Sequence, residues 1–231
     1  MDDLYRELVL LREFGFTHLD VQSPGPPVLR SSAQEPANPA SRQPGNPATE
    51  LATIAAEARI CTKCRLAETR TQVVWGTGNP NADLMFIGEA PGRDEDLKGE
   101  PFVGRAGQLL TDIIKAMKLT RDDVYIANVI KCRPPENRNP EPDELEMCRP
   151  YIKMQVELIK PKVIVTLGKF ALQSLTGKAH AVSASRGAWT DYNGVRVMPT
   201  FHPAYLLRTP SAKKDVWNDM KKVMTELGIA T

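Results

Sequence analysis

The hydrophobic positions of this chain follow two alternating periods from about residue 50 onward. Short, nearly unbroken apolar runs typical of buried strands occur in "ADLMFIGEA", "DVYIANVIKC", "KVIVTLG" and "RVMPTFHP". Apolar residues recur every three or four positions, as on one face of a helix, at 51–58 and in "GRAGQLLTDIIKAMKL", "PDELEMCRPYIKMQVELIKP", "KFALQSLTG" and "AKKDVWNDMKKVMTELG". Strands alternating with helices predict an α/β fold, a three-layer α/β/α sandwich around a mainly parallel four-stranded sheet.

The first 49 residues have a different pattern. Residues 1–20 carry apolar side chains at spacings of three to five, which predicts an amphipathic helix that packs on the core or binds a partner protein. Residues 21–49 are rich in Pro, Ser, Asn and Gln and cannot bury enough apolar surface to offset their ordering entropy, so we expect a flexible linker. The folded domain is therefore expected at 50–231.

Composition places the chain among soluble proteins, because 42% of its 231 residues are hydrophobic and 25% are charged. No apolar run approaches the roughly 18 residues of a membrane helix, and the acidic N-terminus is unlike a signal peptide. We expect a cytoplasmic monomer with no membrane association. Residues 1–50 carry four Lys or Arg against seven Asp or Glu, whereas the rest carry 26 against 21, a basic excess that permits a polyanionic partner.

Four cysteines are spaced as Cys61-x2-Cys64 and Cys132-x15-Cys148. Without a secretory segment, this pattern favours a metal site over disulfides. Structural zinc sites usually contain a second close pair, so the wider second pair suits an iron–sulfur cluster somewhat better. Zinc and four unrelated buried cysteines remain the alternatives.

Three of the predicted strands end in chemically distinctive residues, and ligands of parallel sheets bind beyond the carboxyl ends of the strands. The first strand leads into "GEAPGRDEDLKGEPFVGRAG", where Glu89 and Glu95 belong to a group of five carboxylates and Phe102 is an aromatic residue in a glycine-rich loop. The carboxylates either cap the next helix and face solvent or form part of a site. Phe102 offers a flat surface on which a base could stack.

Two further polar residues lie at the ends of other predicted strands. Asn128 can present a donor and an acceptor to an amide-like ring, and His202 can donate a hydrogen bond to developing negative charge. Each is more often structural when it occurs alone. Their shared position at strand ends predicts a site.

Taken together, "GEAPGRDED", "GEPFVGRAGQLL", "YIANVIKCRPPENRNP", "TLGKFALQSL", "TFHPAYLLR" and the four cysteines resemble the family 4 uracil-DNA glycosylases. The resemblance extends from about Ile60 to Leu227. It implies that Cys61, Cys64, Cys132 and Cys148 hold a [4Fe-4S] cluster. It also implies an activity in base excision repair, in which uracil is flipped out of single- or double-stranded DNA and its bond to deoxyribose is hydrolysed, leaving an abasic site.

The same resemblance implies roles for individual residues around the uracil base. Gly88, Glu89 and Ala90 would line the pocket and Phe102 would stack on the ring. Asn128 would read O4 and N3-H and thereby reject cytosine. His202 would donate to O2 of the departing base.

The residue that orients the attacking water is less clear from sequence, because Ala90 stands where the family 1 motif "GQDPYH" has its Asp. Our prediction for that role is Glu95, together with Glu89. "AYLLR" would form a loop entering the DNA, in which Tyr205, Leu206 and Leu207 wedge into the vacated space and Arg208 meets a phosphate. For the two leucines the alternative is core packing at a helix start.

Two other functions share part of this sequence pattern. The related branch that bonds covalently to the abasic site requires a histidine in an inserted basic loop, and "HAVSASRGAWTDYNG" contains no such insert. The second rival is a DNA-binding module that carries the cluster but has no catalytic activity.

Overall fold

The computed structural model describes residues 46–177 and 181–230. The predicted N-terminal helix and nearly all of the predicted linker lie outside these ranges. The first described helix, α2 (Pro47–Arg59), begins inside the last predicted linker residues, with Asn46 capping it by accepting a hydrogen bond from the N–H of Ala48. Within the described ranges, no helix is both long and apolar enough to cross a membrane.

The four predicted strands form the parallel centre of the sheet. They are β2 (Leu84–Gly88), β3 (Tyr125–Asn128), β4 (Val163–Leu167) and β6 (Val195–Thr200), side by side in the order β3-β2-β4-β6. Two short antiparallel edge strands complete a six-stranded sheet, with β1 (Thr77–Gly78) beside β3 and β5 (Thr190–Tyr192) beside β6. The α/β class and mainly parallel sheet are confirmed, but the predicted number of strands was wrong. The edge strands have two and three residues, too few to produce a recognisable alternation.

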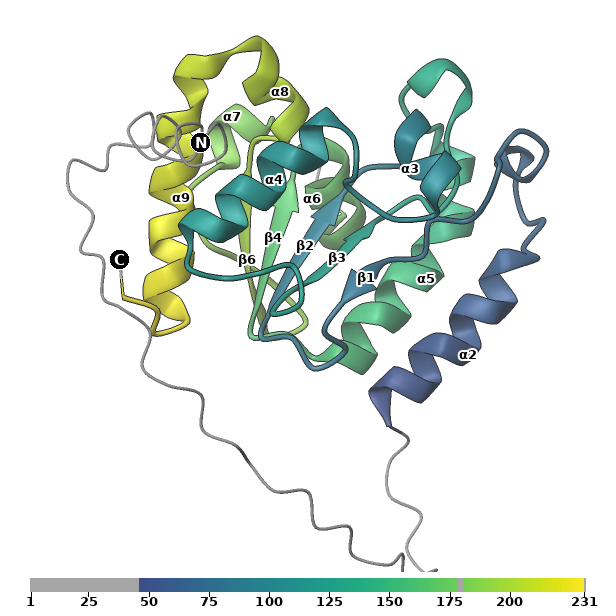
Figure 1. The fold of residues 1–231 in the computed structure, drawn as a ribbon, viewed down its shortest axis with the longest axis horizontal. Helices are drawn as coiled ribbons and strands as arrows, with labels where there is room; N and C mark the ends of the chain where they lie inside the picture. The colour runs from purple at the N-terminus through teal and green to yellow at the C-terminus, as the bar shows by residue number, and fades with distance from the viewer. Residues whose placement is uncertain (1–45, 178–180, 231) are drawn as a thin grey trace, which may run out of the picture.

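Helices cover both faces of the sheet, so the molecule has three layers (Figure 1). The larger helices are α4 (Arg105–Ala116), α5 (Pro142–Ile159), α6 (Lys169–Thr176) and α9 (Lys213–Glu226). Shorter helical segments connect them: η1 (Arg65–Ala67), α3 (Arg93–Lys98), η2 (Pro135–Asn137), α7 (Val182–Ser185), α8 (Pro203–Arg208) and η3 (Pro210–Ala212).

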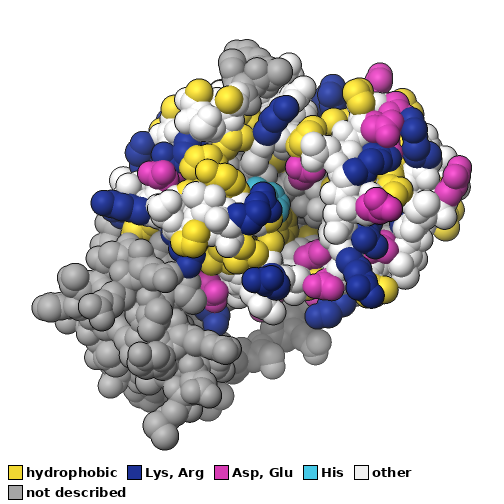
Figure 2. Space-filling model, turned by 90° about the horizontal axis from the view of Figure 1, so that it is seen from above, with side chains coloured by type: hydrophobic (Ala, Val, Ile, Leu, Met, Phe, Trp, Pro, Cys, Tyr) yellow, Lys and Arg dark blue, Asp and Glu magenta, His cyan; other side chains and the backbone are white. Residues whose placement is uncertain are grey.

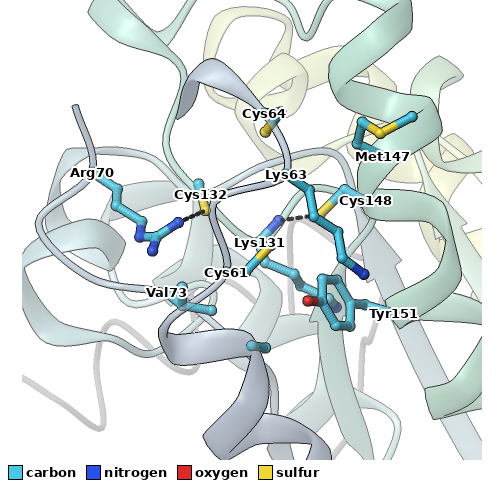
Figure 3. A pocket seen from close by; sticks show the side chains of 11 residues that line it. Cys61, Lys63, Cys64, Arg70, Val73, Lys131, Cys132, Met147, Cys148 and Tyr151 are labelled. Carbon is cyan, nitrogen blue, oxygen red and sulfur yellow. Dashed lines mark hydrogen bonds between the residues drawn. The ribbon is translucent and has the colours of Figure 1, made fainter. Parts of the chain in front are cut away.

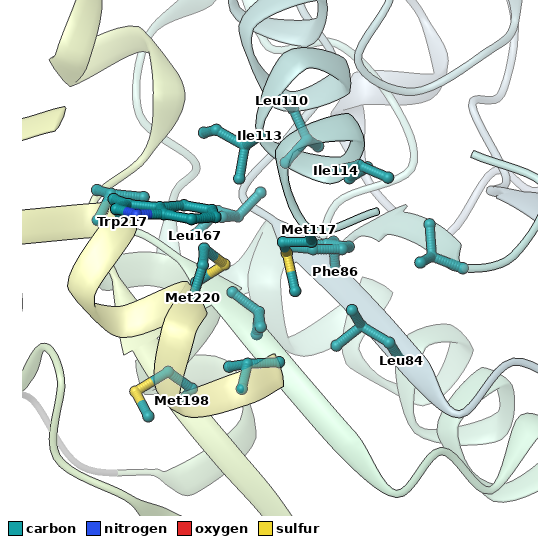
Figure 4. Close-up of a cluster of buried hydrophobic side chains, with 14 of the residues drawn as sticks. Leu84, Phe86, Leu110, Ile113, Ile114, Met117, Leu167, Met198, Trp217 and Met220 are labelled. Carbon is teal, nitrogen blue, oxygen red and sulfur yellow. The ribbon is translucent and has the colours of Figure 1, made fainter. Parts of the chain in front are cut away.

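Each face of the sheet has its own core. Leu84 and Phe86 of β2 belong to one core with Ile113 of α4 and Trp217 of α9 (Figure 4). The intervening Met85 and Ile87 point to the opposite face, where α5 and α6 pack. Because both faces are covered, every residue of β2 is buried, which explains the unbroken apolar run in the sequence. The carboxyl ends of the parallel strands are therefore held in place by a sheet that is packed on both faces.

Candidate functional site

Four predicted site residues meet at the carboxyl ends of the parallel strands. We call Gly88, Phe102, Asn128 and His202 the strand-end cluster. Gly88 and Asn128 are register partners at the ends of β2 and β3, and the rings of Phe102 and His202 lie 5.6 Å apart between centroids. Viewed onto this end, the surface is hollowed near its centre, with a histidine at the edge of the hollow and both basic and acidic side chains around it (Figure 2).

Gly88 is required here by space. A Cβ at this position would lie 2.4 Å from Oδ1 of Asn128 and 2.5 Å from Cζ of Phe102, closer than real Cβ contacts. Asn128 is 2% exposed, and its Oδ1 is buried without a hydrogen-bond partner among the described residues. A buried acceptor without a donor costs free energy, so this oxygen is poised to accept a hydrogen bond from a ligand.

The loop carrying Phe102 is fixed from several directions. Phe102 has a positive φ of 55°, and the guanidinium of Arg121 donates to its carbonyl oxygen at 3.2 Å and to that of Pro101 at 2.8 Å. Gly107 allows α4 to approach this backbone, because a Cβ there would lie 2.0 Å from the Phe102 carbonyl oxygen. The ring of Phe102 is thereby held over Gly88.

His202 is held as a neutral imidazole with a defined tautomer. It is the N-cap of α8, and its Nδ1 accepts a hydrogen bond from the N–H of Ala204 at 3.1 Å. Burial, reinforced by the nearby Arg208, lowers the His202 pKa to about 4. With Nδ1 accepting, the single ring proton lies on Nε2, which is therefore a neutral donor.

The four cysteines, all free, line one cavity together with Arg70, Lys131 and Tyr151 (Figure 3). Cys61 and Cys64 flank the turn after α2, Cys132 follows β3, and Cys148 lies in α5. Arg70 donates to Sγ of Cys132, and the main-chain N–H of Lys131 donates to Sγ of Cys148, both at 3.3 Å. Burial raises the pKa of Cys64, Cys132 and Cys148, so a bound metal would have to favour the thiolates.

This donor set fits an iron–sulfur cluster. Its four thiols have N–H donors directed at two of the sulfurs, an arrangement that also stabilises thiolates bound to such clusters. In the described ranges no three His, Cys, Asp or Glu side chains are grouped closely enough to hold a single metal ion.

Charged residues tie the two cysteine segments together. Glu144 of α5 is fully buried, and its carboxylate accepts hydrogen bonds from Nη2 and Nη1 of Arg138 at 2.6 and 2.9 Å. Arg65, next to Cys64, reaches Asp143 at 2.9 Å and Glu141 at 3.1 Å. The first cysteine pair is thus joined to the start of α5, which carries Cys148.

Comparison with known proteins identifies the family. The model of the uracil DNA glycosylase superfamily matches residues 75–221. A type-4 uracil-DNA glycosylase of Archaeoglobus fulgidus is 46% identical over 178 residues, covering 74% of this chain and 89% of that protein. One from Thermotoga maritima is 45% identical over 180 residues, covering 77% and 91%. The chain belongs to the type-4 uracil-DNA glycosylases. A type-5 uracil-DNA glycosylase of Pyrobaculum aerophilum is less similar, at 30% identity over 179 residues.

In this type-4 glycosylase the two candidate carboxylates have different surroundings. Glu95 of α3 accepts hydrogen bonds from the main-chain N–H groups of Val103 and Gly104, at 3.0 and 2.9 Å, just before α4. Glu89 directly follows Gly88, and its carboxylate has no hydrogen bond among the described residues. Burial raises the Glu89 pKa to about 7 despite the opposing charge of Lys169. Glu95 is engaged in the loop, whereas Glu89 is not.

Ala90 lies toward the cysteine side of the site. Its side chain packs against the apolar cluster that contains Cys132 and Cys148. The carbonyl oxygens of Gly88 and Glu89 accept hydrogen bonds from the N–H groups of Val129 and Ile130, at 3.0 and 2.9 Å. These backbone groups thus extend the β2–β3 pairing beyond the ends of the two strands.

The segment "AYLLR" differs from the prediction, because it forms helix α8 and not a loop. Leu206 is fully buried in the core between the sheet, α4 and α9, so the structure does not present it as a wedge. Tyr205 and Leu207 are 38% and 40% exposed, and Arg208 is exposed at the end of the helix. Core packing, the alternative considered from sequence, describes Leu206 but not Leu207.

Sequence reasoning missed several residues that support the site. Arg121 and Gly107 hold the Phe102 loop, and neither stands out by spacing. Asp219 of α9 is buried, accepts from Oγ1 of Thr200 at 2.7 Å and binds Arg186 through two nitrogens, which braces the end of β6 just before His202. The burial of Lys131 could have been expected from sequence, because it is a single lysine in the otherwise largely apolar run "NVIKC".

Proposed function

We propose that the strand-end cluster is the base pocket of this chain, which by family is a uracil-DNA glycosylase, a DNA-repair hydrolase of N-glycosidic bonds. The observation that carries the proposal is the buried, unpartnered Oδ1 of Asn128 beside Gly88 and Phe102. Uracil fits these groups because its N3–H can donate to Oδ1 while its ring stacks on Phe102. The base must leave the DNA stack to reach them.

The same oxygen supports discrimination against cytosine. Cytosine presents an unprotonated N3, an acceptor, where uracil presents N3–H, so two acceptors would face each other. Each buried polar group left unpaired costs about 1–3 kcal/mol. Gly88 and the braced Phe102 loop leave Asn128 little room to turn away.

His202 supplies the electrostatic part of the reaction. As the bond between C1′ of deoxyribose and N1 of uracil breaks, its electron pair moves into the base and negative charge collects on O2. The Nε2–H of a neutral His202 donates to that oxygen and stabilises the departing anion. Since the His202 pKa is about 4, this donor is available throughout the physiological pH range.

We assign the group that faces the sugar to Glu89 and not to Glu95. An ionised Glu89 would stabilise positive charge on the sugar and orient the water whose oxygen adds to C1′, while the proton of that water passes to the Glu89 carboxylate and then to the departing uracil anion. Glu95 is held by two main-chain N–H groups and supports the Phe102 loop instead. Tyr205, Leu207 and Arg208 on α8 would contact the DNA next to the flipped nucleotide.

The four cysteines would hold a [4Fe-4S] cluster. When bound, the cluster would cross-link the turn after α2, the end of β3 and helix α5, and hydrolysis requires no electron from it. Freshly purified protein is expected to show a visible absorbance band that zinc would not give. A Cys148→Ser variant should lose this band and unfold at a lower temperature.

The N-terminal segment is proposed to be a tether. Residues 1–20 would bind a partner protein and the linker would give the catalytic domain freedom to reach DNA. Removal of residues 1–45 should leave the excision rate of the protein unchanged. A large drop in turnover would contradict this proposal.

The experiment that tests the proposed function is excision of uracil from a single-stranded oligonucleotide by the wild type, Asn128→Ala and His202→Ala. We expect both variants to lose at least about a hundredfold in single-turnover rate while retaining affinity for DNA that carries an abasic analogue. Wild-type rates in both variants would refute the assignment of the pocket. A denaturant-resistant protein–DNA adduct would favour the covalent branch instead.

A further inference from the structure

Lys131 is a fully buried lysine directly behind the base-reading end of β3. It is 1% exposed, and its Nζ donates to the main-chain oxygen of Asn128 at 2.7 Å and to Oε1 of Gln155. This nitrogen also lies 5.3 Å from the centre of the Trp75 ring. A buried amino group is costly unless its donors are satisfied, and here two acceptors and an aromatic face surround it.

The partners of Lys131 are themselves fixed. Gln155 is fully buried in α5, and its Nε2 donates to the carbonyl oxygen of Trp75 at 3.0 Å and to Oη of Tyr125 at 3.2 Å. The Lys131 main chain is also anchored, because its carbonyl oxygen accepts from the N–H of Val74 at 2.8 Å and its N–H donates to Sγ of Cys148 (Figure 3). Nζ of Lys131 therefore occupies a defined position.

The hydrogen bond to Asn128 matters because Gly88 and Phe102 limit how far the Asn128 side chain can turn but donate no hydrogen bond to its Oδ1. The direction in which this oxygen points therefore also depends on the orientation of the main chain that carries it. Asn128 is the last residue of β3. Lys131 reaches back three residues and binds the carbonyl oxygen at the point where the strand ends.

We propose that Lys131 is a positioning residue that holds Asn128 in the orientation that reads uracil. This inference rests on the proposed function, because it requires Asn128 to contact the base. Lys131 itself does not touch the substrate. It acts through the Asn128 main chain and connects that residue to α5.

The test is a double-mutant cycle with Lys131→Met and Asn128→Ala, measured as single-turnover excision of uracil. Methionine keeps most of the volume of lysine and removes its donors. Loss of the hydrogen bond from Nζ of Lys131 should slow excision by about tenfold or more when Asn128 is present. In the Asn128→Ala background the same change should slow it less than about twofold. Affinity for DNA with an abasic analogue should be unchanged.

A merely structural role predicts a different result. Lys131→Met would then slow excision by the same factor in both backgrounds and weaken binding to abasic DNA, and either outcome overturns the inference. Lys162→Met is the matched control, since Lys162 is an exposed lysine paired with Asp83. If Lys131→Met does not fold, Gln155→Met provides the second variant. It should slow excision when Asn128 is present and not in the Asn128→Ala background, and an equal effect in both backgrounds would overturn the inference.

The cycle separates the two hypotheses. If the Asn128→Ala variant keeps the wild-type rate, Asn128 does not read the base, and both the proposed pocket and the role of Lys131 are wrong. A slow Asn128→Ala with equal Lys131→Met effects in both backgrounds overturns only the role of Lys131.

Discussion

The ends of the parallel strands and the segments that follow them hold their side chains in different ways. Gly88 and Asn128 are placed by neighbouring strands in register, with no side-chain hydrogen bond needed to bring them together. Glu95 on α3 and Leu206 on α8 are held by contacts of their own, two main-chain N–H groups in one case and the core in the other. At Gly88 and Asn128 the strand ends leave the site open to a ligand, whereas Glu95 and Leu206 are used to hold their own helices in place.

The same contrast separates Glu89 from Glu95. Glu89 directly follows a strand, and the pKa of its carboxyl group is raised. Glu95 lies six residues further along and accepts hydrogen bonds from the main chain just before α4. A polar group without partners persists only where the surrounding structure fixes its position. The hydrogen-bonded sheet fixes the main chain at the ends of its strands, and so fixes the positions of Glu89 and Asn128.

The largest expected effect comes from filling the space between the strand ends. Gly88→Ala would place a Cβ against Oδ1 of Asn128 and the Phe102 ring. We expect single-turnover excision of uracil to fall by on the order of a hundredfold or more, because a misplacement near 1 Å has that cost. Binding to abasic DNA should be retained. Unchanged excision would show that the base lies elsewhere.

The next largest effect concerns the pH dependence of the excision rate, which should depend on Glu89 and not on Glu95. Burial raises the Glu89 pKa to about 7, so this group becomes ionised, and the excision rate rises, as the pH increases through 7. Glu89→Gln should remove this rise and slow excision at pH 8 by roughly 10–100-fold. His202, with a pKa of about 4, should contribute no change in this range.

Stability provides an independent check on Glu89. Its pKa in the folded protein is above the ordinary value, so the group favours folding at low pH and this contribution is lost as the pH rises through about 7. Glu89→Gln should therefore unfold at a higher temperature than the wild type at pH 8 and show no such gain at pH 4. Equal melting temperatures at pH 8 would indicate an exposed Glu89.

For Glu95 the two uncharged substitutions should behave differently. Glu95→Ala leaves the N–H groups of Val103 and Gly104 without their acceptor, which should cost about 1–3 kcal/mol of stability and slow excision through the Phe102 loop. Glu95→Gln retains an acceptor oxygen and should restore most of both. If the glutamine variant is as slow as the alanine variant, Glu95 acts through its charge and the contrast with Glu89 is wrong.

These differences also explain how far sequence alone could go. The four parallel strands and the residues at their ends were predictable because burial on both faces produces unbroken apolar runs, and the end of a run marks the edge where ligands bind. The edge strands β1 and β5 were too short for that signal. Whether Glu95 or Glu89 faces the sugar depends on how α3 folds back onto α4, and no local pattern encodes that contact.

The smallest expected effect on excision comes from one of two neighbouring leucines of α8. Leu206→Ala removes a fully buried side chain and should lower stability by about 2–5 kcal/mol. Leu207→Ala removes a 40% exposed side chain and should leave the melting temperature unchanged. If Leu207 fills the space vacated by a flipped base, its loss should slow excision several-fold in duplex DNA and leave single-stranded substrate unaffected, since only a duplex must be unstacked and unpaired. Equal slowing on both substrates would place Leu207 in contact with the flipped nucleotide itself. Helix α8 would then contribute a side chain to the base pocket, as the strand ends do.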